Sequence, residues 1–182
     1  MQEQIEHTDY LYRGRVLNLR RDKIQLPGGH TVSREVVEHV DSVGILALDE
    51  NQNLLLVDQY RHPAGKALLE IPAGCLEPGE DPQETAVREL REETGYTASR
   101  IEKLGGFYLA PGYATEYMHI FLASQLGYMP LTAEDTDEIE LVRQPLGSVL
   151  ELVRSGRIED CKSIAAILMM VDRLTGSTQF PG

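Results

Sequence analysis

One helix is marked at both ends by its sequence. In DPQETAVRELREETG, Asp81 is a typical N-cap residue, Pro82 suits the first helical position, and Gly95 is the residue type that most often ends a helix. These signals predict a helix over residues 82–94. Its apolar side chains are expected to face the core: Ala86, Val87 and Leu90. A chain with this helix needs an apolar surface on which the helix can pack.

Strand patterns before and after the helix supply that surface. VGILAL and LLLV are continuous apolar runs, which are typical of a buried sheet. Further strands are expected over residues 101–108, 116–123 and 139–142, and further helices over residues 146–155 and 163–174. Strands flanking amphipathic helices predict an α/β (α+β) protein.

The pattern changes near Asp41. Before it, residues 10–41 alternate between polar and apolar, as half-exposed antiparallel strands do. We therefore expect an N-terminal antiparallel β-sheet segment at residues 1–41 and the main domain at residues 42–182.

The charge balance limits the partners. The 182 residues include 17 Lys and Arg against 29 Asp and Glu, a net charge of −12. This surface would repel nucleic acid and anionic membranes, so neither is expected as a partner, and a phosphorylated substrate would need cations as mediators. No segment is long enough to cross a bilayer, which predicts a soluble, cytoplasmic protein. Cys75 and Cys161 are expected to be free thiols.

Acidic side chains are concentrated on and before the predicted helix. Residues 74–96 hold six glutamates and two arginines. Glu89, Glu92 and Glu93 project from neighbouring turns, where like charges cost a few tenths of a kcal/mol per pair. A hard divalent cation bound between these carboxylates would make their closeness favourable instead of costly. Arg88 is expected to pair with Glu84 or Glu92 and to leave the metal-binding face open. A solvated acidic helix face is the simpler explanation of such a run.

The spacing of these residues favours the metal site. The pattern runs through Gly74, Glu80, Arg88, Glu89, Leu90, Glu92, Glu93 and Gly95. Such a set arises by chance with a probability on the order of one in a million. It closely resembles the signature of the Nudix hydrolase family. Tyr96 departs from the family pattern, which usually has an aliphatic residue there, but a tyrosine ring can also be buried at that position.

The resemblance implies a fold and a chemistry. The fold would be the Nudix fold, a mixed β-sheet sandwiched between α-helices, and the reaction would be hydrolysis of a nucleoside diphosphate linked to another moiety. Mg²⁺ or Mn²⁺ is the implied cofactor. The implied ligands are Glu89, Glu93, the carbonyl of Ala73, and Glu92 as a further ligand or a catalytic, water-orienting group. Glu80 and Arg88 would brace the loop and the helix.

Two stretches outside the signature resemble the branch that cleaves ADP-ribose and other nucleoside diphosphate sugars. Pro111 lies fifteen residues beyond Tyr96, and Glu116 follows it, as in that branch. DQYRHPAGKALLEIPAG resembles its lead-in to the signature, in which Arg61 would contact substrate phosphate and Glu70 would lie near the site. A simple turn at Pro111 and a surface arginine are the competing explanations.

The strand SREVVEHVDSV resembles one that crosses to the partner subunit in this branch. Arg34 and Glu35 would then bind the nucleobase across a homodimer with N-terminal strand exchange. Ordinary exposed strand charges are the alternative.

The acidic stretch EDTDEIE matches the position of a loop that supplies a catalytic carboxylate in this branch. Asp135, Asp137, Glu138 and Glu140 are the candidates. Glu140 and Glu138 are favoured because they flank Ile139 at the start of a predicted strand.

The function expected from the resemblance is metal-dependent hydrolysis of the pyrophosphate bond of a nucleoside diphosphate sugar to a nucleoside monophosphate and a sugar phosphate. ADP-ribose, GDP-mannose and ADP-glucose all remain candidate substrates. Two alternatives belong to other classes: a catalytically silent Nudix-like module that binds a nucleotide as a regulator, and an acidic interaction protein without a ligand.

Overall fold

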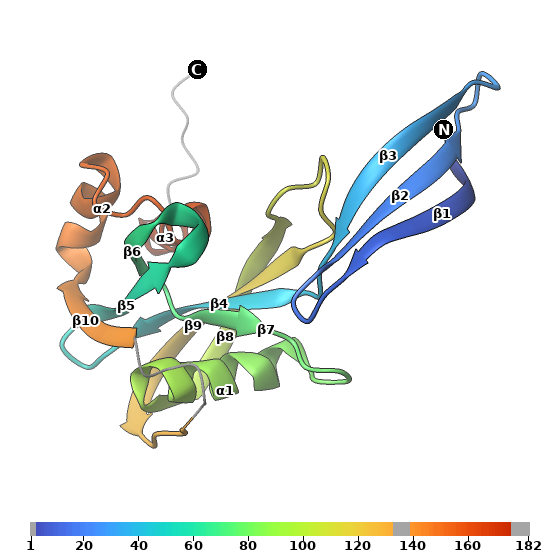
Figure 1. Ribbon diagram of the computed structural model, residues 1–182. Helices are drawn as coiled ribbons and strands as arrows, with labels where there is room; N and C mark the ends of the chain where they lie inside the picture. Colours follow the sequence, from blue (N-terminus) through green and yellow to red (C-terminus); the bar gives the residue numbers. More distant parts are fainter. Residues whose placement is uncertain (1–2, 133–138, 176–182) are drawn as a thin grey trace. The chain divides into compact units, whose positions relative to one another are not determined.

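The computed structural model describes residues 3–132 and 139–175 (Figure 1). Contacts divide the chain into two compact units. One combines Met1–Asp41 with Phe107–Met118, and the other, the main unit, combines Ser42–Gly106 with His119–Gly182. The sequence predicts a boundary between residues 41 and 42. It does not predict that Phe107–Met118 groups with the N-terminal strands, and the division into domains remains a prediction.

The N-terminal unit is an antiparallel three-stranded sheet in the order β1 (Gln4–Arg13), β2 (Asn18–Gln25) and β3 (Thr31–Glu38). The alternating pattern predicts half-exposed strands: β2 is partly buried, at Asp22 and Ile24, whereas β1 is mostly exposed and β3 is exposed or half-buried. Several large apolar side chains on this unit are exposed: Ile5, Tyr10, Leu11, Tyr12, Val16, Leu17 and Val40.

The segment Phe107–Met118 is tied to β3 by backbone hydrogen bonds. The N–H of Val37 donates to the Tyr113 carbonyl at 2.8 Å, and the N–H of Thr115 donates to the Val37 carbonyl at 3.0 Å. These bonds explain why a segment far along the chain clusters with the N-terminal strands.

The main unit is built on a seven-stranded mixed sheet. Its strands are β4 (Ser42–Leu48), β5 (Asn53–Arg61), β6 (Lys66–Glu70), β7 (Ala73–Cys75), β8 (Tyr96–Tyr108), β9 (Tyr117–Tyr128) and β10 (Ile139–Pro145). The main path is β10-β5-β4-β9-β8, with β6 paired to β5 and β7 to β4. Every residue of β4 is buried, which confirms the buried sheet predicted from VGILAL.

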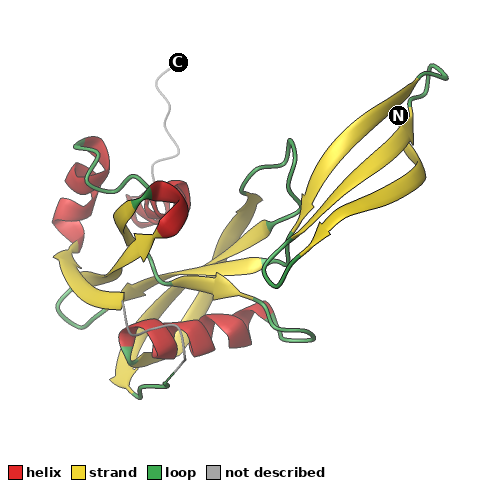
Figure 2. Cartoon of the chain, in the orientation of Figure 1, coloured by secondary structure: helices red, strands yellow, loops and turns green. Residues whose placement is uncertain are grey.

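Helices cover both faces of this sheet (Figures 1 and 2). They are α1 (Pro82–Thr94), α2 (Leu146–Arg154) and α3 (Cys161–Thr175), with a 3₁₀ turn at His62–Ala64. α1 lies on one face of the main unit's sheet and α3 on the other. The predicted class, α+β with a sheet between helices, is therefore confirmed.

The ends of α1 follow the predicted signals. The Asp81 side chain accepts a hydrogen bond from the Gln83 N–H at 2.8 Å, and Gly95 ends the helix in the left-handed conformation at φ 77°. Ala86 and Leu90 are fully buried. They join a core cluster with side chains of β4 and β9: Val43, Ile45, Ala47, Phe121 and Ala123. This packing fixes which face of α1 is left for polar side chains.

Within the described residues, no helix is long and apolar enough to span a membrane. Neither Cys75 nor Cys161 forms a disulfide within the described residues, as predicted.

Candidate active site

The short strand β7 contacts α1 through its backbone. The N–H of Ala73 donates to Oε2 of Glu93 at 3.0 Å, and the carbonyl of Cys75 accepts from Nη2 of Arg88 at 3.1 Å. The strand β7 is itself paired to the buried strand β4. These bonds therefore hold the glutamate face of α1, which consists of Glu89, Glu92 and Glu93, against the sheet.

Gly74, between those two residues, lies against Glu89. A Cβ atom at position 74 would be 2.0 Å from Cδ of Glu89, a distance that no side chain tolerates. Any larger residue at position 74 would therefore force the Glu89 carboxylate or the strand to move.

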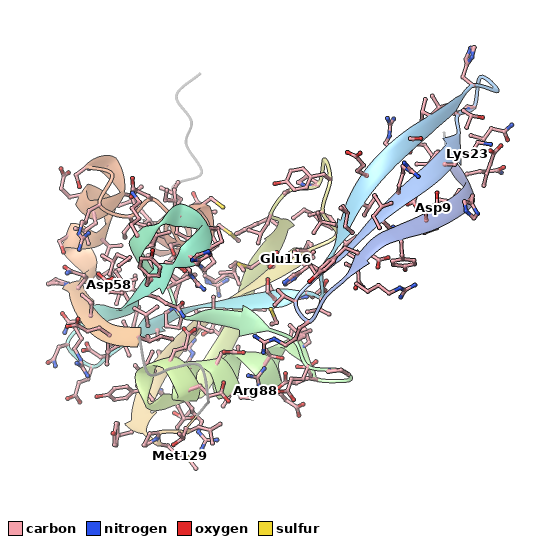
Figure 3. All side chains as sticks on the ribbon, in the orientation of Figure 1. Asp9, Lys23, Asp58, Arg88, Glu116 and Met129 are labelled. Carbon is pink, nitrogen blue, oxygen red and sulfur yellow. The ribbon has the colours of Figure 1, made fainter. Side chains whose placement is uncertain are left out.

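Arg88 joins four partners around the helix start, and its position on α1 is seen in Figure 3. It forms a two-pronged ion pair with Glu80, with both N–O distances at 3.0 Å. Its Nη1 also donates to Glu89 at 2.7 Å and to Glu92 at 3.2 Å. The predicted pair with Glu92 is present. The alternative partner Glu84 is not used, because the loop before α1 folds Glu80 back onto the guanidinium.

The expectation that Arg88 leaves the metal-binding face open is wrong. Its guanidinium bridges Glu89 and Glu92, two of the predicted ligands. In this structure Arg88 thus supplies the positive charge for these two carboxylates.

Ion pairing and burial act on the motif glutamates in opposite directions. Hydrogen bonds from Arg88 lower the pKa of Glu80 to about 2, and the same pairing raises the pKa of Arg88. Burial raises the pKa of Glu89, although Arg88 partly offsets it.

Glu93 is shifted in the same direction as Glu89. Burial raises its pKa to about 8, and the negative charge of Glu89 adds to this rise. The hydrogen bond from Ala73 and the charges of Arg61 and Lys162 act the other way. Burial makes the charged form of this carboxyl unfavourable, and an additional cation nearby would stabilise that charged form.

The donor chemistry suits a hard divalent ion. Glu89, Glu92 and Glu93 offer only oxygen donors, and burial disfavours the unpaired charges of Glu89 and Glu93. Across residues 3–132 and 139–175, however, no three acidic, His or Cys side chains already converge as a metal-binding group. The oxygen donors of the three glutamates thus suit a hard divalent ion. Two of them, Glu89 and Glu92, are paired with Arg88 in this structure.

A second ionic cluster includes Arg61, for which the resemblance implies a contact with substrate phosphate. Arg61 forms a two-pronged pair with Glu70 at 3.0 and 2.7 Å. Glu70 is 1% exposed, and Lys162 from α3 donates to the same carboxylate. Lys162 was not predicted from the sequence. The only local signal was Asp160, an N-cap residue three positions before Ser163.

Four predicted substrate-binding residues belong to the N-terminal unit. Arg34 and Glu35 are exposed on β3, and Pro111 lies in an exposed turn. Glu116 is 3.7 Å from the ring of His39. The glutamates of α1 belong to the main unit, so the substrate-binding roles of these four residues remain predictions.

Of the predicted catalytic carboxylates, Glu140 is exposed on β10, directly opposite Asp58 of β5. Glu138 lies outside the described residues, as do Asp135 and Asp137.

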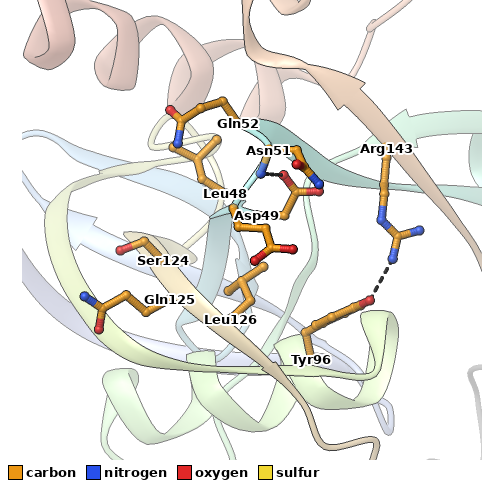
Figure 4. A pocket seen from close by; sticks show the side chains of 10 residues that line it. Leu48, Asp49, Asn51, Gln52, Tyr96, Ser124, Gln125, Leu126 and Arg143 are labelled. Atoms are coloured by element: carbon orange, nitrogen blue, oxygen red, sulfur yellow. Dashed lines mark hydrogen bonds between the residues drawn. The ribbon is translucent and has the colours of Figure 1, made fainter.

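A pocket of about 580 Å³ lies apart from the glutamate face, between the β4–β5 turn, β9 and Arg143 (Figure 4). None of the glutamates of α1 lines it. Arg143 donates to the hydroxyl of Tyr96 at 2.8 Å, and the Tyr96 ring packs edge-on against Tyr128 with centroids 5.6 Å apart. The half-buried Tyr96 ring therefore packs in place of the aliphatic side chain usual in the family.

Comparisons with known proteins identify relatives of this chain. Residues 38–159 match the NUDIX domain, and residues 3–37 match the nucleoside diphosphate sugar hydrolase N-terminal domain. The chain is 39% identical to an ADP-ribose pyrophosphatase of Bacillus subtilis, over 92% of this chain and 91% of the relative. It is also 39% identical to a methanol dehydrogenase activator of Bacillus methanolicus, over 91% of each chain.

The fold is shared with a solved structure, that of an ADP compounds hydrolase. The TM-score is 0.88 at 22% identity, over 99% of this chain and 98% of the other. Together with the glutamate-lined helix, the family matches identify the chain as a member of the Nudix family, and it is a Nudix hydrolase.

Proposed function

We propose that this enzyme hydrolyses the pyrophosphate bond of ADP-ribose or a related nucleoside diphosphate sugar, giving a nucleoside monophosphate and a sugar phosphate. The observation that carries the proposal is that Arg61 and Glu93, two groups of opposite charge in the main unit, influence each other. The Arg61 guanidinium is close enough to Glu93 to lower the pKa of that carboxyl. Arg61, the cation proposed to bind phosphate, therefore lies within electrostatic range of Glu93. The match of residues 3–37 to a nucleoside diphosphate sugar hydrolase domain supports the substrate class.

The reaction would depend on Mg²⁺ or Mn²⁺. Glu89, Glu92 and Glu93 would hold the ion, with the backbone carbonyl of Ala73. Such an ion neutralises pyrophosphate oxygens and lowers the pKa of an attacking water.

The chain's own groups would divide the remaining tasks. Ala73 fixes the Glu93 carboxylate, and Glu80 fixes Arg88, so that the helix face is held in one arrangement. Glu92 would orient the water, while Glu140 or Glu138 would accept its proton as the general base. Arg61 would bind a phosphate oxygen of the substrate.

Nucleobase recognition is assigned to the N-terminal unit. Arg34 and Glu35 would bind the base, with Pro111 and Glu116 beside it, across a homodimer with exchange of N-terminal strands. The exposed apolar side chains of this unit, among them Leu11 and Val16, support an interface there.

The competing function is that of a catalytically silent regulatory module. The name of the Bacillus methanolicus relative, an activator of another enzyme, is the observation in its favour. A silent module would be expected to lose the metal-binding carboxylates, yet Glu89, Glu92 and Glu93 are all present. Hydrolysis is therefore the better supported function.

Phosphate release, coupled to a phosphatase, tests the proposal. ADP-ribose, ADP-glucose, GDP-mannose, UDP-glucose, dinucleotides and nucleoside triphosphates would each be assayed with and without Mg²⁺ or Mn²⁺. Metal-dependent turnover of one or more nucleoside diphosphate sugars is expected. Turnover of triphosphates alone would contradict the substrate class, and absence of any turnover would favour the regulatory module.

A further inference from the structure

A buried ion network joins the start of α3 to the paired strands β5 and β6. Glu70, the last residue of β6, receives two hydrogen bonds from Arg61 and one from Nζ of Lys162. Glu70 is 1% exposed and Lys162 is 8% exposed. One buried carboxylate is thus shared by two cations, and such groups are retained in protein interiors only when they are fully paired.

Residues at the start of α3 hold Lys162 in place. Its Nζ also donates to Asp160 at 2.8 Å, and Asp160 accepts hydrogen bonds from the N–H and the hydroxyl of Ser163 at 2.9 and 2.5 Å. The Ser163 hydroxyl oxygen in turn accepts from the N–H of Ile71 at 2.8 Å. Because Ile71 follows Glu70 directly, α3 fixes both the carboxylate and the backbone beside it.

The two cations differ in exposure. The side chain of Arg61 is 38% exposed, whereas that of Lys162 is 10% exposed. Arg61 can therefore meet a ligand, whereas Lys162 is buried against Glu70. Both charges lower the pKa of Glu93, so the network lies within electrostatic range of the motif glutamates.

The charge balance of the network depends on Lys162. Arg61 and Lys162 balance Glu70 and Asp160, so the four groups carry no net charge together. Without Lys162, the charges of Glu70 and Asp160 would outweigh that of Arg61, and these three groups would carry a net negative charge. A phosphate would then be attracted less strongly, and Glu70 would have lost one of the two cations that fix its position.

We propose that Lys162 is a positioning residue for substrate phosphate: it holds Glu70 so that Arg61 is presented in one orientation, and its charge offsets one of the two carboxylates of the network. Lys162 itself does not touch the substrate. The proposal rests on the proposed function, in which Arg61 binds a phosphate oxygen. The alternative is a purely structural role, in which the network only attaches α3 to the sheet.

Steady-state kinetics of Lys162→Gln, with ADP-ribose and Mg²⁺, separate these roles. We expect KM to rise about tenfold while kcat changes by less than about threefold, because binding of the phosphate is weakened while the hydrogen bonds described above for Glu89, Glu92 and Glu93 do not involve Lys162. Lys66→Gln is the matched control. Lys66 pairs with Glu159, adjacent to Asp160, and lies opposite Arg61 in the β5–β6 register, but both members of its pair are exposed. KM and kcat of this variant should stay within about twofold of the parent values.

A double-mutant cycle shows whether Lys162 acts through Arg61. Arg61→Ala alone should raise KM, and adding Lys162→Gln to it should cause little further rise. If Lys162→Gln raised KM by the same factor in the Arg61→Ala variant as in the parent enzyme, the proposal would be overturned. An unchanged KM in folded Lys162→Gln, with only the melting temperature lowered, would establish the structural role instead.

Asp160→Asn gives a second test if Lys162→Gln does not fold. Asparagine can still cap α3 but removes the charge that holds Lys162, so a KM rise of about threefold is expected. An unchanged KM would contradict the proposal. Affinity for ADP, measured by calorimetry, reports the phosphate contact without turnover. Weaker ADP binding by the Lys162 variant would support the positioning role even if the parent enzyme hydrolysed no nucleoside diphosphate sugar, a result that would count against the proposed function alone.

Discussion

The carboxylate of Glu89 lies against the backbone of Gly74, so closely that a Cβ at position 74 would be 2.0 Å from its Cδ atom. Gly74→Ala should therefore displace Glu89 or β7, at a cost of about 1–3 kcal/mol in the free energy of unfolding. Activity should fall as well, because Glu89 is a proposed metal ligand. Thermal unfolding and phosphate release would measure the two effects.

Gly147→Ala is the control for that substitution. Gly147 lies in α2, and a Cβ atom at this position would meet no other atom within 4 Å, so alanine should be neutral or slightly stabilising there. If Gly74→Ala were as stable and as active as the parent protein, the Glu89 carboxylate would not lie in close contact with the backbone of Gly74.

Glu93→Gln should abolish most turnover without unfolding the protein. Glutamine can still accept the hydrogen bond from Ala73, but it lacks the charge for a divalent cation, so kcat should fall about 100-fold or more. Stability should be maintained, since burial already disfavours the charged form of this side chain. Glu84→Gln, at an exposed position in the first turn of α1, is the control and should retain full activity. Full turnover by Glu93→Gln would show that this glutamate is not a metal ligand.

Acid should weaken the structure through Glu80. Its pKa is lowered from 4.5 to about 2 in the folded protein, so the pairing with Arg88 stabilises the fold fully above pH 4.5 and is lost as the pH falls towards 2. A charged hydrogen bond of this kind contributes on the order of 1–3 kcal/mol. Glu80→Gln should lower the free energy of unfolding at pH 7 and flatten its decline between pH 4.5 and 2. Urea unfolding at several pH values measures this, and an unchanged slope would argue against the assignment.

The proposed dimer can be tested at the exposed apolar side chains of the N-terminal unit. Leu11 and Val16 are 50% and 60% exposed. If they lie in an interface, Leu11→Asp with Val16→Asp should convert the dimer to a monomer, as measured by light scattering. Leu168→Asp is the control, because Leu168 is 49% exposed on α3 in the main unit. A parent protein that is monomeric at working concentration would remove the dimer from the proposal.

Local signals were enough to predict α1 and the buried strand β4. The helix has its N-cap at Asp81 and its end at Gly95, and the apolar run VGILAL of β4 reflects a strand that is buried along its whole length. The lengths of β8 and β9 were underestimated, since their outer residues are polar and resemble loops. β1, β6 and β7 were not predicted as strands. β7 has only three residues and exists through its pairing with β4.

Side-chain partners across the sequence were harder to predict. The pairing of Arg88 was expected within one helical turn, yet its main partner is Glu80, eight residues away in the preceding loop. The contact of Lys162 with Glu70 spans 92 residues, and no local pattern encodes it. Such contacts depend on how α3 packs on the sheet, which the chemistry of neighbouring residues does not determine.

Strand β7 also has a consequence for how this sequence can vary. Its three residues each meet a different side chain of α1, but Ala73 and Cys75 do so through a backbone N–H and a carbonyl. Substitutions at those two positions would keep these bonds, whereas insertion or deletion of one residue would move every contact to the wrong partner. The strand should therefore accept changes of side chain at its two ends while accepting no change of length.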